Sequence, residues 1–379
     1  MKRWMRWLAV LGVMTAAAGA QAEALDPALA AEAEQSIQKG LQWLLAQQQT
    51  DGHWSNPDFP ALTGLPLWAL AQSGTNQQPA VNKAVQYIMD SVHEDGSIWR
   101  QPSVEAKGGG LANYNTAICM VALNRVDRPD LTPIVLMARQ YMSKQQHLGD
   151  DIYKGGMGYD PATGRPYADL SNSYMAYEAM RLTENVEDLR KHGDPKANLD
   201  WDAAAQFIES VQNGKDTNDP ENSGGFAYKP DGSQAGASTN AAGEIRFRSY
   251  GSMTYAGLLS FIYADVNKDD PRVASAMDWA TRHWTLEENP GMGKQGLYYF
   301  YNVLAKALAV YGQTALTFPD GSKRDWRSDL IKKLLALQKT DEKTGLAYWA
   351  NDEGRWWESD PVLVTSYSIL ALQAAVKAK

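Results

Sequence analysis

The clearest evidence for the fold is a unit of sequence that first appears near the start of the chain. It reads Gln35-Ser-Ile-Gln-Lys-Gly-Leu-Gln-Trp-Leu-Leu-Ala-Gln-Gln48 and is followed by the turn Asp51-Gly-His-Trp54. Its apolar side chains recur three or four residues apart, at Ile37, Leu41 and Leu44, and most residues between them are polar. This spacing predicts an amphipathic helix with one buried stripe. The glycine that follows favours the left-handed backbone at which many helices end.

The same unit recurs along the chain of 379 residues. An apolar residue stands four positions before a glutamine at Leu44/Gln48, Met142/Gln146, Ile208/Gln212 and Leu334/Gln338. A glycine stands two or three positions before an aromatic residue at Gly52/Trp54, Gly96/Trp99, Gly156/Tyr159, Gly225/Tyr228 and Gly345/Tyr348. A repeat of this length predicts stacked units that each contribute one supersecondary element.

Each turn precedes a second segment that is apolar on most faces, which predicts a largely buried helix. The six segments are Ala61 to Gln72, Leu111 to Asn124, Asp169 to Leu182, Ser249 to Ala264, Gly296 to Tyr311 and Pro361 to Val376. Two helices per repeat give about twelve helices, which form either an open solenoid or a ring. A ring is favoured because these segments are too apolar for the concave face of a solenoid. The predicted fold class is all-α, an (α/α)6 toroid that closes as a barrel of six helix-pair repeats.

The motif Lys39-Gly40-x-x-Trp43-Leu44-x-x-x-Gln48-x-x-x-Gly52-x-Trp54 resembles the QW repeat of squalene cyclases. The six-repeat organisation of the chain resembles the terpenoid cyclase and protein prenyltransferase superfamily. The first repeat matches strictly and the later ones only partly. The resemblance implies a toroid in which the glutamine and tryptophan side chains tie the outer helix ends together around a central cavity.

The catalytic motifs of that superfamily are absent from the sequence. No Asp-x-Asp-Asp acid occurs, and the single cysteine, Cys119, is followed by Met120 rather than by the Gly-Glu-Gln of a thioester run. The histidines, His53, His93, His147, His192 and His283, are scattered without metal-ligand spacing. We therefore expect no metal and no cofactor, and a buried, unreactive thiol at Cys119.

Residues 1–22 have the form of an export signal, with a basic start, an apolar run over 8–18 and small residues at Ala20 and Ala22. We expect cleavage after Ala22, a periplasmic or secreted location, and one domain over residues 23–379. We also expect a monomer without a transmembrane anchor. The formal charge of −8 argues against nucleic acid as a partner.

Tyrosine stands beside serine, threonine or asparagine at the start of five of the second helices. These residues are Tyr114, Tyr174, Tyr255, Tyr301 and Tyr367. Their side chains either cap helix ends and bridge neighbouring repeats, or line a cavity that takes an apolar or amphipathic ligand.

Two long insertions, at about 147–169 and 214–248, are expected to cover the mouth of such a cavity. The first contains the candidate catalytic acids, Asp150, Asp151, Asp160 and Asp169. The second ends in Arg246 and Arg248, which either bind an anion together with Lys294 or pair with surface carboxylates.

Three functions stay open at this point. The first is a toroid without catalytic activity that binds an apolar or amphipathic small molecule or a protein partner. The second is a divergent enzyme on isoprenoid-like substrates, which needs a deep aromatic cavity with a carboxyl group at its top. The third is a polysaccharide-active toroid, which needs an open groove with two carboxyl groups roughly 5 to 9.5 Å apart.

Overall fold

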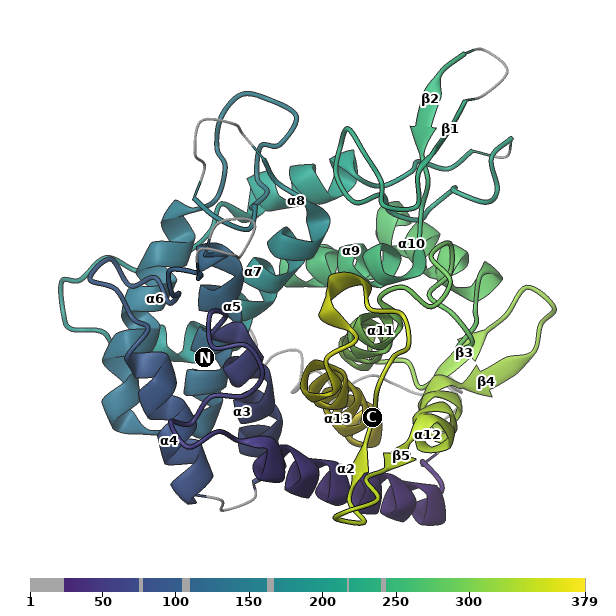
Figure 1. The fold of residues 1–379 in the computed structure, drawn as a ribbon. Coiled ribbons are helices and arrows are strands. Elements are labelled where there is room, and N and C mark those ends of the chain that lie inside the picture. Colours follow the sequence, from purple (N-terminus) through teal and green to yellow (C-terminus); the bar gives the residue numbers. More distant parts are fainter. Residues whose placement is uncertain are drawn as a thin grey trace, which may run out of the picture.

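The computed structural model describes residues 24–74, 78–103, 110–161, 167–216, 218–239 and 243–378. The predicted signal segment, residues 1–22 with its cleavage site, lies outside these ranges. The described chain is mostly helical, as the sequence predicts, and its helices alternate between an inner and an outer position (Figure 1). Three antiparallel hairpins project from it: β1 (Ala237–Thr239) with β2 (Ile245–Phe247), β3 (Ala315–Thr317) with β4 (Lys323–Asp325), and β5 (Lys339–Thr340) with β6 (Ala347–Tyr348).

Six inner helices carry most of the buried residues. They are α3 (Ala61–Ser73), α5 (Ala112–Val126), α7 (Leu170–Leu182), α9 (Gly251–Tyr263), α11 (Leu297–Tyr311) and α13 (Pro361–Lys377), each within two residues of a predicted segment. Each inner helix contacts the next in chain order, and α13 contacts α3, so the series of contacts returns to its start. Cys119 is buried in α5, and burial raises its pKa, as expected for an unreactive thiol.

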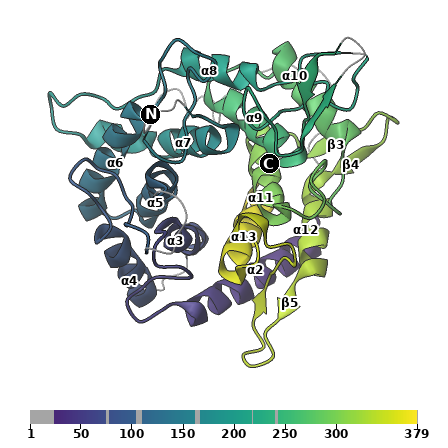
Figure 2. The same ribbon diagram turned by 45° about the horizontal axis from the view of Figure 1, so that its top comes forward.

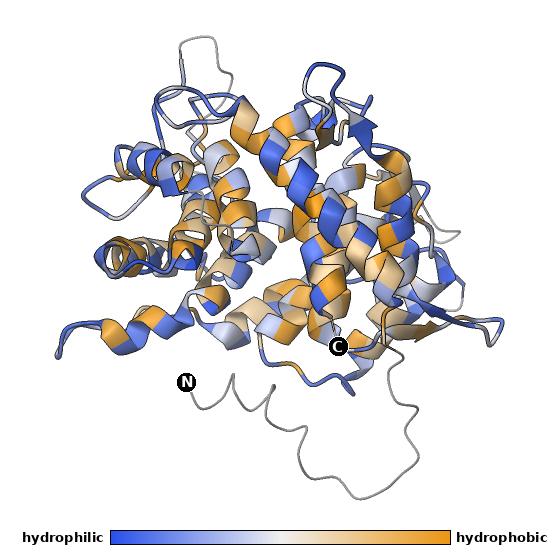
Figure 3. Ribbon diagram, turned by 90° about the horizontal axis from the view of Figure 1, so that it is seen from below, coloured by the Kyte–Doolittle hydropathy of each residue, from blue (hydrophilic) through white to orange (hydrophobic). Residues whose placement is uncertain are grey.

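Six outer helices surround the inner ones (Figure 2). They are α2 (Pro27–Gln47), α4 (Gln78–Met89), α6 (Thr132–Lys144), α8 (Trp201–Ser210), α10 (Pro271–Arg282) and α12 (Trp326–Leu337). Each buries one stripe, as Ile37, Leu41 and Leu44 do in α2, and leaves its polar face toward solvent. Hydrophobic residues accordingly gather in the interior of the view in Figure 3, while the peripheral loops are largely hydrophilic.

The repeated glutamines join neighbouring outer helices. The Nε2 atom of Gln48 donates to the carbonyl of Gly52 at 3.0 Å, in its own turn, and to that of Ala80 at 2.9 Å, at the start of α4. The same pair of bonds is made by Gln146 to Gly155 and Asp200, and by Gln212 to Gly224 and Arg272. One side chain thus satisfies two backbone carbonyls and fixes the spacing between consecutive repeats.

In the first four repeats, a glycine with positive φ lets the turn approach the next outer helix. Gly52 has φ +101°, and a Cβ there would lie 2.3 Å from the carbonyl oxygen of Lys83 in α4. In the third and fourth repeats this place is taken by Gly155 and Gly224. The repeat pattern in the sequence uses Gly156 and Gly225 instead, so in these two repeats it points to the residue after the glycine that has positive φ.

Side chains also connect the first repeat to the last. The indole of Trp43 in α2 donates to Asp341 Oδ2 at 3.1 Å and stacks on Tyr348, with ring centroids 5.1 Å apart. Gln373 in α13 donates to the carbonyl of Ala69 in α3 at 3.0 Å. The two ends of the described chain therefore pack on each other through specific polar contacts.

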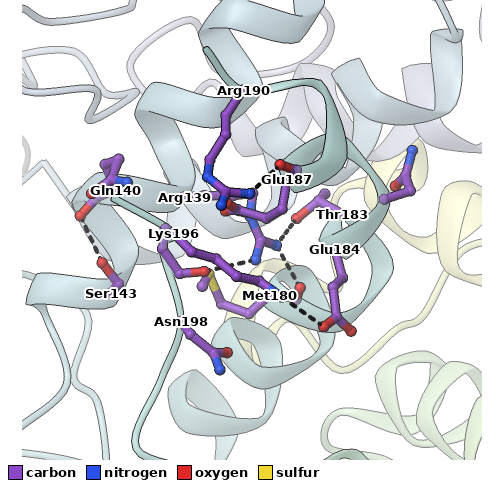
Figure 4. Close-up of polar contacts among 12 residues, drawn as sticks. Arg139, Gln140, Ser143, Met180, Thr183, Glu184, Glu187, Arg190, Lys196 and Asn198 are labelled. Carbon is purple, nitrogen blue, oxygen red and sulfur yellow. Dashed lines mark hydrogen bonds and ion pairs between the residues drawn. The ribbon is translucent and has the colours of Figure 1, made fainter. Parts of the chain in front are cut away.

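A buried arginine organises the segment between α7 and α8 (Figure 4). Arg139 in α6 is 1% exposed, and its Nε donates to Glu187 Oε1 at 2.6 Å. The other guanidinium nitrogens donate to the carbonyl of Met180 at 2.6 Å, the hydroxyl of Thr183 at 2.7 Å and the carbonyl of Ala197 at 3.1 Å. One side chain thereby ties α6 to the end of α7 and to the irregular segment that follows it.

Candidate functional site

A cavity of about 320 Å³ lies among the first two turns of the inner helices. Every inner helix contributes to its wall, for example through Leu62, Tyr114, Met175, Met253, Tyr299 and Tyr367. The two long insertions contribute Tyr159 and Tyr228. The wall is therefore mainly aromatic and aliphatic, which is typical of pockets for small molecules.

Two tyrosine hydroxyls of the wall pair with neighbouring hydroxyl groups. The hydroxyl of Tyr299 lies 3.0 Å from Ser171 Oγ, and that of Tyr228 lies 3.4 Å from the hydroxyl of Tyr167. Burial raises the pKa of Tyr114, so this hydroxyl stays neutral. The cavity thus offers aromatic faces and neutral hydroxyl groups.

Glu358 supplies a buried carboxyl group to the wall. Its Oε1 accepts from the backbone N–H of Tyr299 at 2.7 Å, and its Oε2 accepts from Tyr298 N–H at 3.3 Å and from Asn351 Nδ2 at 2.6 Å. Because the first N–H groups of a helix have no partner within it, this carboxyl caps α11. Burial raises the pKa of Glu358 from 4.5 to about 7, and the N–H donors oppose the rise.

We expect folding stability to depend on the protonation of Glu358. Its pKa is higher in the folded than in the unfolded protein, so stability is lost as the pH rises from about 4.5 to about 7. The loss is at most about 3 kcal/mol. In Glu358→Gln, which cannot titrate here, the free energy of unfolding should therefore fall less between pH 5 and pH 8 than in the wild type. Urea denaturation at both pH values measures the difference, and equal falls in the two proteins would contradict the raised pKa.

Two tryptophans cover the cavity at η4 (Arg355–Trp357). Trp356 and Trp357 have φ values of +55° and +69°, a region that bulky residues adopt at an energetic cost, and they are 39% and 44% exposed. The edge of one ring meets Phe59, since the Trp357 and Phe59 centroids are 4.8 Å apart at 85°. Gly296 leaves room for the other, because a Cβ at that position would lie 3.1 Å from the Trp356 ring. Two half-exposed rings thus form the solvent side of the wall.

Asp169 lies close behind the wall, near enough to Tyr228, which lines the cavity, for the Tyr228 hydroxyl to lower the pKa of this carboxyl. It is the N-cap of α7 and accepts from the backbone N–H of Asn172 at 2.9 Å and from its Nδ2 at 2.8 Å. Burial raises the pKa of Asp169 from 3.8 to about 6, against these hydrogen bonds.

The other candidate acids lie elsewhere. Asp150 and Asp151 are exposed, and Asp151 binds the ring of His147 at 2.8 Å. Asp160 caps α5 by accepting from the backbone N–H of Ala112 at 2.8 Å. The structure brings none of these three to the cavity wall.

The five candidate tyrosines divide into three groups. Tyr114 and Tyr367 line the cavity, and Tyr174 lines a smaller cavity next to it. Tyr255 and Tyr301 are buried outside both lining sets. Their surroundings explain this, because Tyr255 packs on the ring of Phe300 and Tyr301 donates to the carbonyl of Leu286 at 2.5 Å.

The two candidate arginines lie on the β1–β2 hairpin side and not in the central cavity. Arg246 forms an ion pair with Asp216 at 2.5 Å. Of the two roles predicted for this arginine, the structure therefore favours pairing with a carboxylate over anion binding. Arg248 is exposed, and its backbone N–H donates to the carbonyl of Gly236 at 3.0 Å.

Several wall residues were not candidates from the sequence: Tyr159, Tyr228, Tyr250, Tyr299, Trp356, Trp357 and Glu358. The first two are the aromatic members of the repeated glycine-aromatic pairs, so the pattern contained a signal for them. Glu358 stands in a turn before the Asp360-Pro361 helix start, and nothing local marks it as buried.

Comparison with solved structures supports the fold. The chain is similar to the type II terpene cyclase MstE from Scytonema (12% identity, TM-score 0.55, 94% of this chain and 100% of that one). It is also similar to cellobiose 2-epimerase from Spirochaeta thermophila (12% identity, TM-score 0.57, 93% of this chain and 98% of that one). A third similar structure is protein geranylgeranyltransferase-I from Candida albicans (14% identity, TM-score 0.52, 89% of this chain and 90% of that one). No family model and no curated protein matches the sequence. At these identities the similarity shows a shared fold of (α/α)6 enzymes and no specific activity.

The described residues contain neither a membrane-spanning helix nor a cluster of metal ligands. None of the helices there is long and apolar enough to cross a bilayer. The same part of the chain holds no group of three or more His, Cys, Asp or Glu side chains placed to bind a metal ion.

Proposed function

We propose that the protein is a closed (α/α)6 toroid of six helix pairs that binds an apolar or amphipathic small molecule in its central cavity. The observation that carries the proposal is the cavity of about 320 Å³, to which all six inner helices contribute and whose wall is mainly aromatic and aliphatic. Its volume lies within the range of small-molecule sites. A terpene cyclase of similar fold was solved in complex with geranylgeranyl dihydroxybenzoate, which is compatible with an amphipathic ligand.

The polar groups of the cavity wall support ligand binding rather than catalysis. Glu358 is the one carboxylate among the described lining residues, and both of its oxygens already accept N–H groups at the start of α11. Asp169 likewise accepts from the backbone N–H and the side-chain Nδ2 of Asn172. We therefore propose no catalytic residue.

The remaining parts of the proposal rest on the sequence. We propose export directed by residues 1–22, cleavage after Ala22, and a periplasmic or secreted monomer. Its single domain then comprises residues 23–379.

Filling the cavity should weaken binding. Met175 lies on the wall, so the larger indole of Met175→Trp would occupy ligand space. We expect the wild type to bind 1-decanol by isothermal titration calorimetry, and this variant to bind it at least about tenfold more weakly, a loss of about 1.4 kcal/mol. The matched control is Met137→Trp, on the half-exposed face of α6, which should bind as the wild type does. Equal affinity in all three proteins would refute the cavity as the binding site.

A further inference from the structure

A second, much smaller cavity of about 20 Å³ adjoins the central one. Met175, Tyr299 and Tyr367 line both cavities, so these three side chains form the boundary between them. The lining of the smaller cavity is mainly apolar, but it also includes Glu178, Asn302 and Lys306. A compartment with a small number of polar side chains therefore lies next to the aromatic one.

Glu178 and Lys306 form a buried ion pair in this compartment. Lys306 Nζ lies 2.9 Å from Glu178 Oε2; the Lys306 side chain is 13% exposed and that of Glu178 is 6% exposed. Glu178 also accepts from the hydroxyls of Tyr174 and Tyr263, each at 3.2 Å. Lys306 Nζ lies 4.1 Å from the ring centre of Trp68, a cation–π contact that stabilises its charge. The carboxylate is thus supplied with three donors.

Lys306 and Asn302 keep unused hydrogen-bonding capacity. Lysine has three N–H donors, and among the described residues Lys306 uses one, toward Glu178. Asn302 is 3% exposed, and its Oδ1 has no partner in the described part of the chain. The two residues stand four apart on α11, so they share one face of the helix, and both line the small cavity. A donor and an acceptor therefore face the same small space.

We infer that this compartment binds a terminal hydroxyl group of an elongated, otherwise apolar ligand whose body occupies the central cavity. The inference rests on the proposed function of that cavity. A hydroxyl group is both acceptor and donor, so it accepts from Lys306 Nζ and donates to Asn302 Oδ1. A volume of about 20 Å³ is close to what one oxygen atom with its hydrogen needs.

Other terminal groups fit this compartment less well. A carboxylate needs space for two oxygens, brings a second negative charge beside Glu178 and offers no donor to Asn302. An ether oxygen accepts from Lys306 but leaves Asn302 Oδ1 unpaired. The ligand class is therefore a long-chain or polycyclic alcohol rather than an acid or an ether.

The test compares 1-decanol, 1-methoxydecane and decanoate as probes of the full chain by isothermal titration calorimetry. We expect 1-decanol to bind about tenfold or more tightly than either of the others, since an unsatisfied buried acceptor weakens binding by about that factor. In Asn302→Leu the preference over 1-methoxydecane should fall to about threefold or less. The matched control is Ser260→Ala, which removes another unpaired buried oxygen on α9, outside both cavities, and should keep the preference.

A second variant keeps the test decisive if Asn302→Leu does not fold. Glu178→Gln combined with Lys306→Met removes the ion pair without leaving one buried charge, and it should also lose the preference for the alcohol. Equal binding of 1-decanol and 1-methoxydecane to the wild type would overturn this inference and leave the proposed function standing. An unchanged preference for 1-decanol in the variants would have the same consequence. If no probe binds the wild type, the proposed function fails together with the inference.

Discussion

Replacing Arg139 with methionine should lower the free energy of unfolding by roughly 3 to 5 kcal/mol. The guanidinium is buried and donates to Glu187 Oε1 at 2.6 Å, so the variant leaves a buried carboxylate without its counter-charge. It also removes the donors to the carbonyls of Met180 and Ala197. Urea denaturation followed by circular dichroism measures the loss.

A second variant separates these two costs. In Arg139→Met combined with Glu187→Leu, no buried charge remains, and stability should recover in part. Recovery stays incomplete because the carbonyls of Met180 and Ala197 still lack a donor. If the double variant is no more stable than the single one, the cost comes from the lost carbonyl contacts rather than from the unpaired carboxylate. A single variant as stable as the wild type would refute the role given to Arg139.

The repeat architecture could be predicted because its determinants are local. The apolar periodicity of segments such as 61–72 and 361–376 is a property of consecutive residues, and the helices found there match it within two residues. The glutamine four positions after an apolar residue also marked real contacts, since Gln48 and its equivalents join successive outer helices. The buried hydrogen-bond network of Arg139 could not be predicted in this way, because its partners are 41 to 58 residues away in the sequence.

The cavity wall was predicted less well because it depends on helix phase. Successive residues in a helix point about 100° apart, so residues two positions apart face nearly opposite sides. Tyr299 lines the cavity, whereas Tyr301 faces the carbonyl of Leu286. Met253 and Tyr255 on α9 differ in the same way. A motif of neighbouring tyrosines therefore identified the right turns of these helices and the wrong residues within them.

The last large effect concerns Trp54, which closes the first repeat. Its side chain is fully buried, its Nε1 donates to the carbonyl of Leu44 at 2.6 Å, and its backbone N–H donates to Thr63 Oγ1 at 3.2 Å. Trp349 makes the same two bonds in the sixth repeat, to Leu334 at 2.8 Å and Thr365 at 3.0 Å. Each tryptophan thereby joins an outer helix end to the start of the following inner helix.

We expect Trp54→Ala to lower the free energy of unfolding by about 3 to 5 kcal/mol, because it removes a large buried ring and leaves a cavity. Trp349→Ala should show a similar loss, since that residue occupies the equivalent place. The matched control is Trp357→Ala, whose ring is 44% exposed, so that far less buried surface disappears and stability should change little. Thermal unfolding of the three variants tests the expectation. An unchanged midpoint for Trp54→Ala would contradict the role of this tryptophan in the repeat turn, and an equal loss for Trp357→Ala would show that the effect is not specific to that turn.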